Sequence, residues 1–226
     1  IISTESEMIT VAIRRLDLNR DNSNDLMSFL KKLNMNILPN TAGCKNIEEI
    51  MLTCELSREL IETNWVKLEA IKDKKYLLPD PIMTLNAAEK LIKKGFKVLP
   101  YINSDPELAK NLENVGCSTV MPLASPIGSG NGVNNEENIK IIIEQSKVPV
   151  VVDAGLAVPS DAARVMEIGA DAVLVNTAIA ESRVPKDMGR AFNLGVKAGR
   201  ISFNSGRIPI KQIASASSPK TNLIGT

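Results

Sequence analysis

One short segment of the chain holds a lysine and a glutamate at a spacing that suggests chemistry. Trp65–Ile71 is an apolar run interrupted only by Lys67 and Glu69. Side chains alternate across a β-strand, so these two are expected on one face. Burial disfavours an ammonium ion, and we expect it to lower the pKa of Lys67 and leave a free amine that attacks a ketone. The segment predicts imine chemistry on Lys67, with Glu69 as counter-ion or proton carrier. A buried pair that only fills the interior is the alternative.

A carboxylate ends a second apolar strand. The run Val148–Val152 is followed directly by Asp153. Catalytic groups of parallel barrels lie at the carboxyl ends of the strands, which makes Asp153 a candidate acid–base residue. The alternative is that Asp153 accepts backbone N–H bonds and holds its own loop.

Two loops near the end of the chain are candidates for binding a phosphate. Barrels often bind phosphate with the loops after strands seven and eight. With one strand placed upstream of residue 1, Ala154 and Gly155 follow strand seven, and Asn176 and Thr177 follow strand eight. Glycine permits close backbone approach, and amide and hydroxyl groups add donors. Taken alone, Asn176 and Thr177 are also typical of a helix cap.

A glycine-rich loop is the third candidate. Ser125–Gly132 contains Gly128 and follows a predicted strand, so its backbone N–H groups could surround a phosphate or a sugar. Such loops are common, and only the position beside the other two loops favours this interpretation.

The elements that must position these residues alternate between short β-rich runs and longer amphipathic segments. Such alternation is typical of βα units around a parallel sheet, either a closed barrel or a doubly wound open sheet. Candidate polar residues that end several different strands favour the barrel, and a G-x-G-x-x-G motif is missing. Pro81–Lys94 is predicted as a helix that ends at Gly95, and Gly169 ends another. The predicted strands are Met8–Arg14, Asn36–Pro39, Val66–Ile71, Lys97–Tyr101, Thr119–Met121, Val148–Val152 and Ala172–Val175.

The predicted fold class is therefore α/β, a TIM (βα)₈ barrel with seven of its strands in the sequence. The chain opens in a helix-like segment, Ile2–Glu7, so we expect the first strand and most of the first helix to lie upstream. A length of 226 residues without a linker predicts a single domain over 1–226. The Ser-rich stretch Ser215–Pro219 predicts a flexible tail from about residue 213.

Composition excludes several classes of function. The formal net charge of +1 gives no basic face for nucleic acid, and the longest apolar runs are far too short to cross a membrane. We expect a soluble protein. No histidine is present, which excludes Ser-His and Cys-His nucleophiles and His-ligated metals. The three cysteines lack C-x-x-C spacing and predict buried, reduced thiols, with neither disulfide nor metal site.

Taken in order, several runs of this chain resemble the thiazole synthase family. The resemblance covers nearly the whole sequence, and so many ordered motifs at compatible spacings make it specific. The runs are Leu38–Gly43, Lys67–Glu69, Leu77–Pro81, Val98–Tyr101, Ser125–Gly130, Val148–Gly155, Gly169–Ala180 and Ala198–Arg200.

The resemblance implies a lysine imine with 1-deoxy-D-xylulose 5-phosphate. It further implies sulfur from a ubiquitin-like carrier protein with a C-terminal thiocarboxylate, dehydroglycine as the source of the remaining ring atoms, no metal or organic cofactor, and a homotetramer. The compartment would be the cytoplasm, or the stroma of a plastid. Carried over by position, Lys67 forms the Schiff base and Glu69 and Asp153 move protons. The implied sugar-phosphate ligands are Gly128, Ala154, Gly155, Asn176 and Thr177.

Two departures and two alternatives accompany this interpretation. Ala124 and Ala157 stand where the family pattern predicts glycine, which puts the approach of the loops to phosphate in doubt. A lysine-dependent pyridoxal phosphate synthase would also combine a barrel, imine chemistry and a phosphate site. A barrel that binds phosphate or the carrier protein without turnover is the alternative outside catalysis.

Overall fold

Parallel strands form the centre of the protein. The structure is a computed structural model that describes residues 1–15, 29–30, 32–33 and 35–217. In these ranges the strands are β1 (Met8–Ala12), β2 (Asn36–Asn40), β3 (Trp65–Leu68), β4 (Lys97–Ile102), β5 (Met121–Pro122), β6 (Val151–Asp153) and β7 (Ala172–Leu174).

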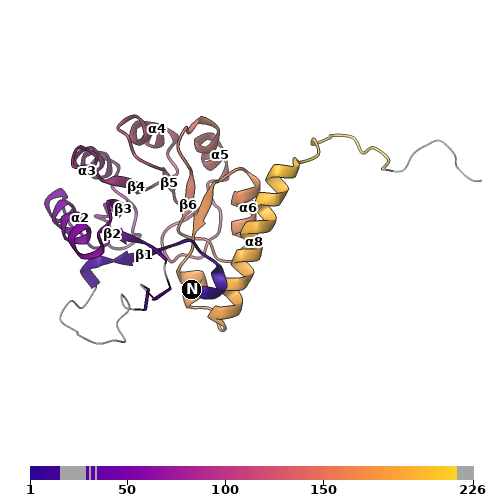
Figure 1. Cartoon of the computed structure of the whole chain (residues 1–226). Coiled ribbons are helices and arrows are strands. Elements are labelled where there is room, and N and C mark those ends of the chain that lie inside the picture. The colour runs from indigo at the N-terminus through magenta and orange to yellow at the C-terminus, as the bar shows by residue number, and fades with distance from the viewer. Residues whose placement is uncertain (16–28, 31, 34, 218–226) are drawn as a thin grey trace, which may run out of the picture.

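The strands follow one another around a curled sheet in chain order. β1 to β5 pair in sequence, and β6 pairs with β7, all in parallel. The parallel bridges Val120–Val150 and Leu123–Asp153 connect β5 to β6. Among the described residues, β7 and β1 share no ladder. Helices lie on the outside of the curl (Figure 1). The predicted α/β fold of the TIM-barrel type is confirmed.

Helices return the chain between strands, as parallel pairing requires. Asp80 caps one of them by accepting from the Met83 N–H at 2.8 Å, and Pro81 occupies its first turn. Gly95 and Gly169 follow helix ends at φ 80° and 107°, as predicted. The helices are α2 (Ile47–Ile61), α3 (Pro81–Lys93), α4 (Pro106–Asn114), α5 (Glu136–Gln145), α6 (Pro159–Glu167), α7 (Thr177–Ala180) and α8 (Pro185–Ser205), with 3₁₀ turns η1 (Ile2–Thr4) and η2 (Ile13–Arg15).

The sheet has an apolar layer on each of its two faces. Val66 and Leu68 belong to the large core between the strands and helices α2 and α3. Leu99 and Met121 belong to a smaller cluster that fills the inside of the curl. Because side chains alternate along β3, Lys67 points to the inside, opposite its two apolar neighbours.

All seven predicted strands differ from the observed strands by at least one residue at an end. The strand expected to reach Arg14 ends at Ala12, because Ile13–Arg15 turns into η2. The strand expected over Val66–Ile71 ends at Leu68. The strand expected to start at Val148 begins at Val151, because Pro149 has no N–H to donate to a strand ladder.

The two ends of the described chain differ in packing. η1 lies against α8 (Figure 1), where Glu5 Oε2 is 2.5 Å from Lys197 Nζ. Residues 207–217 are exposed and contain no helix or strand. The predicted tail falls partly here, and positions 218 and 219 lie outside the described residues. No helix in the described part of the chain is long and apolar enough to cross a membrane.

Candidate active site

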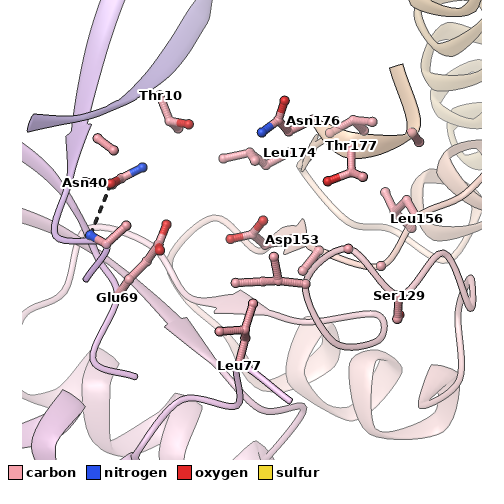
Figure 2. Close-up of a pocket in the computed structure, with 18 of the residues that line it drawn as sticks. Thr10, Asn40, Glu69, Leu77, Ser129, Asp153, Leu156, Leu174, Asn176 and Thr177 are labelled. Carbon is pink, nitrogen blue, oxygen red and sulfur yellow. Dashed lines mark hydrogen bonds between the residues drawn. The ribbon is translucent and has the colours of Figure 1, made fainter. Parts of the chain in front are cut away.

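A cavity of about 860 Å³ opens at the carboxyl ends of the strands. Figure 2 shows the carboxylates of Glu69 and Asp153 directed toward one another inside it, with Asn176 and Thr177 on a neighbouring wall. The structure brings all eight residues predicted from the sequence to this one cavity: Lys67, Glu69, Gly128, Asp153, Ala154, Gly155, Asn176 and Thr177. The volume is in the range of small-molecule sites.

Lys67 lies between two carboxylates. Its Nζ is 2.5 Å from Asp153 Oδ2 and 3.3 Å from Glu69 Oε1. The three residues are 4%, 2% and 7% exposed, so the whole group is removed from bulk water. One ammonium and two carboxylates in such a volume leave one negative charge in excess, and the group can hold or pass on a proton.

The predicted direction of the Lys67 pKa shift is wrong. Burial by itself would lower the pKa of Lys67, but the charges of Asp153 and Glu69 raise it above its ordinary value. The sequence argument considered burial and missed the second carboxylate, which reaches the lysine from β6. The resting lysine is therefore an ammonium, and a proton must leave it before it can attack a carbonyl.

Glu69 lies just past the end of β3 and is held there by a side chain of the neighbouring segment. The Thr41 hydroxyl accepts from the Glu69 N–H at 2.9 Å and donates to the Glu69 carbonyl at 3.0 Å. Burial raises the pKa of Glu69, and Lys67 only partly opposes that effect. A raised pKa makes the Glu69 carboxyl easier to protonate, which suits a group that takes up and returns a proton.

Asp153 does not hold its own loop. Its Oδ2 makes the ion pair with Lys67 and has no other hydrogen-bond partner among the described residues. The backbone of Asp153 is fixed instead, because its carbonyl accepts from the Ala124 N–H at 3.0 Å. The carboxylate therefore extends from a fixed backbone, and its ion pair is with Lys67.

The backbone after Asp153 has an unusual conformation. Ala154 and Gly155 have φ values of 60° and 75°. A Cβ on Gly155 would lie 1.9 Å from Ser125 Oγ and 2.7 Å from its backbone N. This loop therefore passes so close to the start of the glycine-rich loop that only glycine fits.

The remaining predicted ligands leave polar groups open to the cavity. Asn176 stands at the N-cap position of α7, but its side chain makes no capping bond to that helix. The helix-cap alternative therefore does not account for its amide. Gly128 has φ 70°, and a Cβ there would meet nothing within 4 Å.

Residues that the sequence argument did not assign to the site also line the cavity. Thr10 is the one polar residue of β1, and Asn40 is a polar residue at the carboxyl end of β2, positions that could have identified them. Arg15 had no such signal, whereas Ser129 lies within the glycine-rich loop that the sequence predicts to bind phosphate. Within the described ranges, no group of three His, Cys, Asp or Glu side chains is placed to hold a metal ion.

Comparison with known proteins agrees with this geometry. The family model described as "Thiazole biosynthesis protein ThiG" matches residues 1–219. A curated thiazole synthase of Prochlorococcus marinus (strain MIT 9515) is 56% identical over 99% of this chain and 86% of its own length. That of Synechococcus sp. (strain ATCC 27144 / PCC 6301 / SAUG 1402/1) is 53% identical over 100% of this chain and 84% of its own. The chain belongs to the thiazole synthase family. It is an enzyme of thiamin biosynthesis, and the predicted family is confirmed.

Solved structures show the same fold around this thiazole synthase site. The Amycolatopsis orientalis BexX/CysO complex matches with a TM-score of 0.81 at 29% identity, over 95% of this chain and 86% of that one. The native KDPGal structure matches with a TM-score of 0.60 at 12% identity, over 88% of this chain and 86% of that one, and therefore shows likeness of fold alone.

Proposed function

We propose that this thiazole synthase builds thiazole phosphate from 1-deoxy-D-xylulose 5-phosphate, dehydroglycine and sulfur delivered by a carrier-protein thiocarboxylate. The observation that carries the proposal is Lys67, buried at the cavity between Asp153 and Glu69. An amine in this place forms an imine with the sugar ketone once a proton leaves it.

Asp153 and Glu69 divide the proton transfers between them. Asp153 is the nearer carboxylate to Lys67 Nζ and takes its proton when the ketone enters. Glu69, whose pKa burial raises, can deliver or hold a proton while the carbonyl moves along the sugar. Both steps require groups within hydrogen-bond reach of the reacting atoms, which the two short contacts to Lys67 support.

The loops after β6 and β7 and the glycine-rich loop hold the sugar phosphate. Positive-φ backbone at Ala154, Gly155 and Gly128 turns the chain at the cavity wall, and the side chains of Asn176 and Thr177 add polar donors. Oriented backbone N–H groups and neutral donors suit a phosphate anion without requiring a cation.

Sulfur comes from a partner in this proposal. Cys44, Cys54 and Cys117 are all buried. Burial raises the pKa of the Cys54 and Cys117 thiols to about 12, so neither forms a thiolate readily at neutral pH. The BexX neighbour is in complex with CysO, which supports a carrier protein as the donor. A homotetramer is proposed on the family resemblance alone.

Borohydride trapping tests the imine. The protein is incubated with deoxyxylulose phosphate, reduced, digested and mapped by mass spectrometry. We expect the adduct on the peptide that contains Lys67. Lys67→Arg keeps a cation beside the two carboxylates and should lose the adduct completely, whereas Lys72→Ala, at an exposed lysine outside the cavity, should keep it.

The outcomes separate the alternatives. A folded wild-type protein that forms no adduct at Lys67 contradicts the proposal, and tight binding without an adduct would favour a non-catalytic barrel. If the protein forms an adduct with a pentose phosphate and turns over without any carrier protein, the pyridoxal phosphate synthase type would be favoured.

A further inference from the structure

Tyr101 lies inside the curled sheet beside the reacting lysine. It is 0% exposed and sits on β4, two residues after Leu99 on the same face. In the β4–β5 ladder it pairs with Met121, which belongs with Leu99 to the inner apolar cluster. The Tyr101 ring therefore faces the interior, not the helices. Lys67 Nζ is 5.7 Å from its centroid.

The hydroxyl of Tyr101 is buried without a partner. Its oxygen has no hydrogen-bond partner among the described residues, and the nearby Ile127 backbone N–H only partly offsets the rise in the pKa of the phenol. A buried hydroxyl with no partner destabilises a fold, and phenylalanine would fill the same space without that cost. The hydroxyl is therefore better explained by the reaction than by the packing.

The surroundings of Tyr101 allow it to donate but not to act as a base. Burial and the charges of Asp153 and Glu69 raise the pKa of Tyr101, so the phenol keeps its proton. Ile127, which is close to the phenol, lines the cavity, so the buried hydroxyl lies next to the substrate space although Tyr101 itself is not part of the cavity wall.

We propose that Tyr101 is a further catalytic residue, whose hydroxyl donates a hydrogen bond to the oxygen on the carbon that Lys67 attacks. This rests on the proposed imine function. Before attack, the Lys67 ammonium gives one proton to Asp153. The Lys67 nitrogen then bonds to the carbonyl carbon as the C=O π bond breaks, and a second nitrogen proton passes through Glu69 to the oxygen, which becomes a hydroxyl. Asp153 returns its proton to this hydroxyl as the C–O bond breaks, so the oxygen leaves as water while the nitrogen lone pair forms the C=N bond of a protonated imine.

Throughout these reaction steps Tyr101 keeps its own proton. Its hydrogen bond stabilises the negative charge that develops on oxygen during attack, in the manner of an oxyanion-hole donor. Before substrate enters, the hydroxyl has no hydrogen-bond partner among the described residues. The substrate oxygen then becomes its acceptor.

The test compares the two tyrosines of the chain. Rates of borohydride-trapped adduct are measured in single turnover with deoxyxylulose phosphate for wild type, Tyr101→Phe and Tyr76→Phe. We expect Tyr101→Phe to slow trapping by about 100-fold, the lower end of what an oxyanion donor contributes. Its Kd for the sugar phosphate should stay within about threefold, and its Tm should equal or exceed that of wild type, because an unpaired buried hydroxyl is removed. Tyr76, 56% exposed, should give wild-type values.

Three results would overturn the inference. Trapping of Tyr101→Phe at the wild-type rate removes the hydroxyl from the reaction while the imine proposal stands. If Tyr101→Phe has a lower Tm and binds the sugar phosphate more weakly by the same factor as its trapping slows, the role of the hydroxyl is structural. Failure of wild type to form the Lys67 adduct overturns the imine proposal, and this inference with it.

Discussion

The cavity has two kinds of wall. In the first kind, Lys67, Glu69 and Asp153 contribute buried charged side chains on or beside ordinary strands. In the second kind, Gly155 and Gly128 contribute almost no side chain but have positive φ. The first wall depends on which side chains are present, and the second on which backbone conformations are possible.

This difference separates the effects of substitution. A change among the charged side chains alters proton transfer and the pKa of Lys67 while leaving the backbone as it is. A change in the loops alters the backbone itself, and stability falls with it.

Asp153→Asn should have the largest effect. The amide keeps the shape of the carboxylate but cannot accept the Lys67 proton, so adduct formation should slow by about 10²–10⁴-fold. Loss of this charge also removes a cause of the raised Lys67 pKa. Wild-type trapping should rise with pH across the alkaline range, because the ammonium must lose a proton. The variant's profile should shift to lower pH.

Glu181→Gln is the matched control, since Glu181 is an exposed carboxylate on the wall of the same cavity. Single-turnover trapping from pH 6 to 10 provides the measurement. Equal loss of rate in both variants would mean that the general negative charge of the cavity matters, and not the contact with Lys67.

Gly155→Ala should come next, as a loss of stability. The new Cβ would overlap the Ser125 backbone, and φ 75° strains any residue with a side chain. Overpacking and strain together suggest a loss of about 2–4 kcal/mol in the free energy of unfolding. Gly128→Ala has a similar φ but open space, and should lose only about 1–2 kcal/mol. Urea unfolding of both variants is the measurement, and equal losses would contradict the close approach to Ser125.

The charged wall could be predicted from the sequence because strand alternation is a local rule. Lys67 and Glu69 share a face for that reason, and Asp153 ends an apolar run. The sign of the Lys67 pKa shift could not be predicted, since it depends on a contact between β3 and β6 that no local pattern contains. The support of Glu69 by Thr41 was missed for the same reason.

The loop wall was predicted in composition but not in conformation. Glycine at 128 and 155 marked flexible backbone, whereas nothing in the sequence indicates that Ala154 has a positive φ. The conformation follows from the packing of this loop against Ser125, which is a tertiary contact. Bounds of short strands such as β5 depend on tertiary pairing in the same way.

Ala154→Gly should have the smallest effect and the opposite sign. At φ 60°, alanine carries about 1–2 kcal/mol of strain that glycine would relieve. The greater freedom of glycine in the unfolded chain offsets about 0.4–1 kcal/mol of that gain. A net stabilisation of about 0.5 kcal/mol should raise the Tm by roughly 1–2 °C in a chain of this size.

Ala157→Gly is the control for that measurement, because Ala157 lines the same cavity but is not among the residues with positive φ. At Ala157 there is no positive φ to relieve, so the change to glycine only increases the conformational freedom of the unfolded chain, and the Tm should fall. If both variants melt lower than wild type by the same amount, Ala154 carries no strain, and the loop wall is held by side-chain packing instead. Opposite signs in two Ala-to-Gly changes on one wall would locate the constraint in the backbone at position 154.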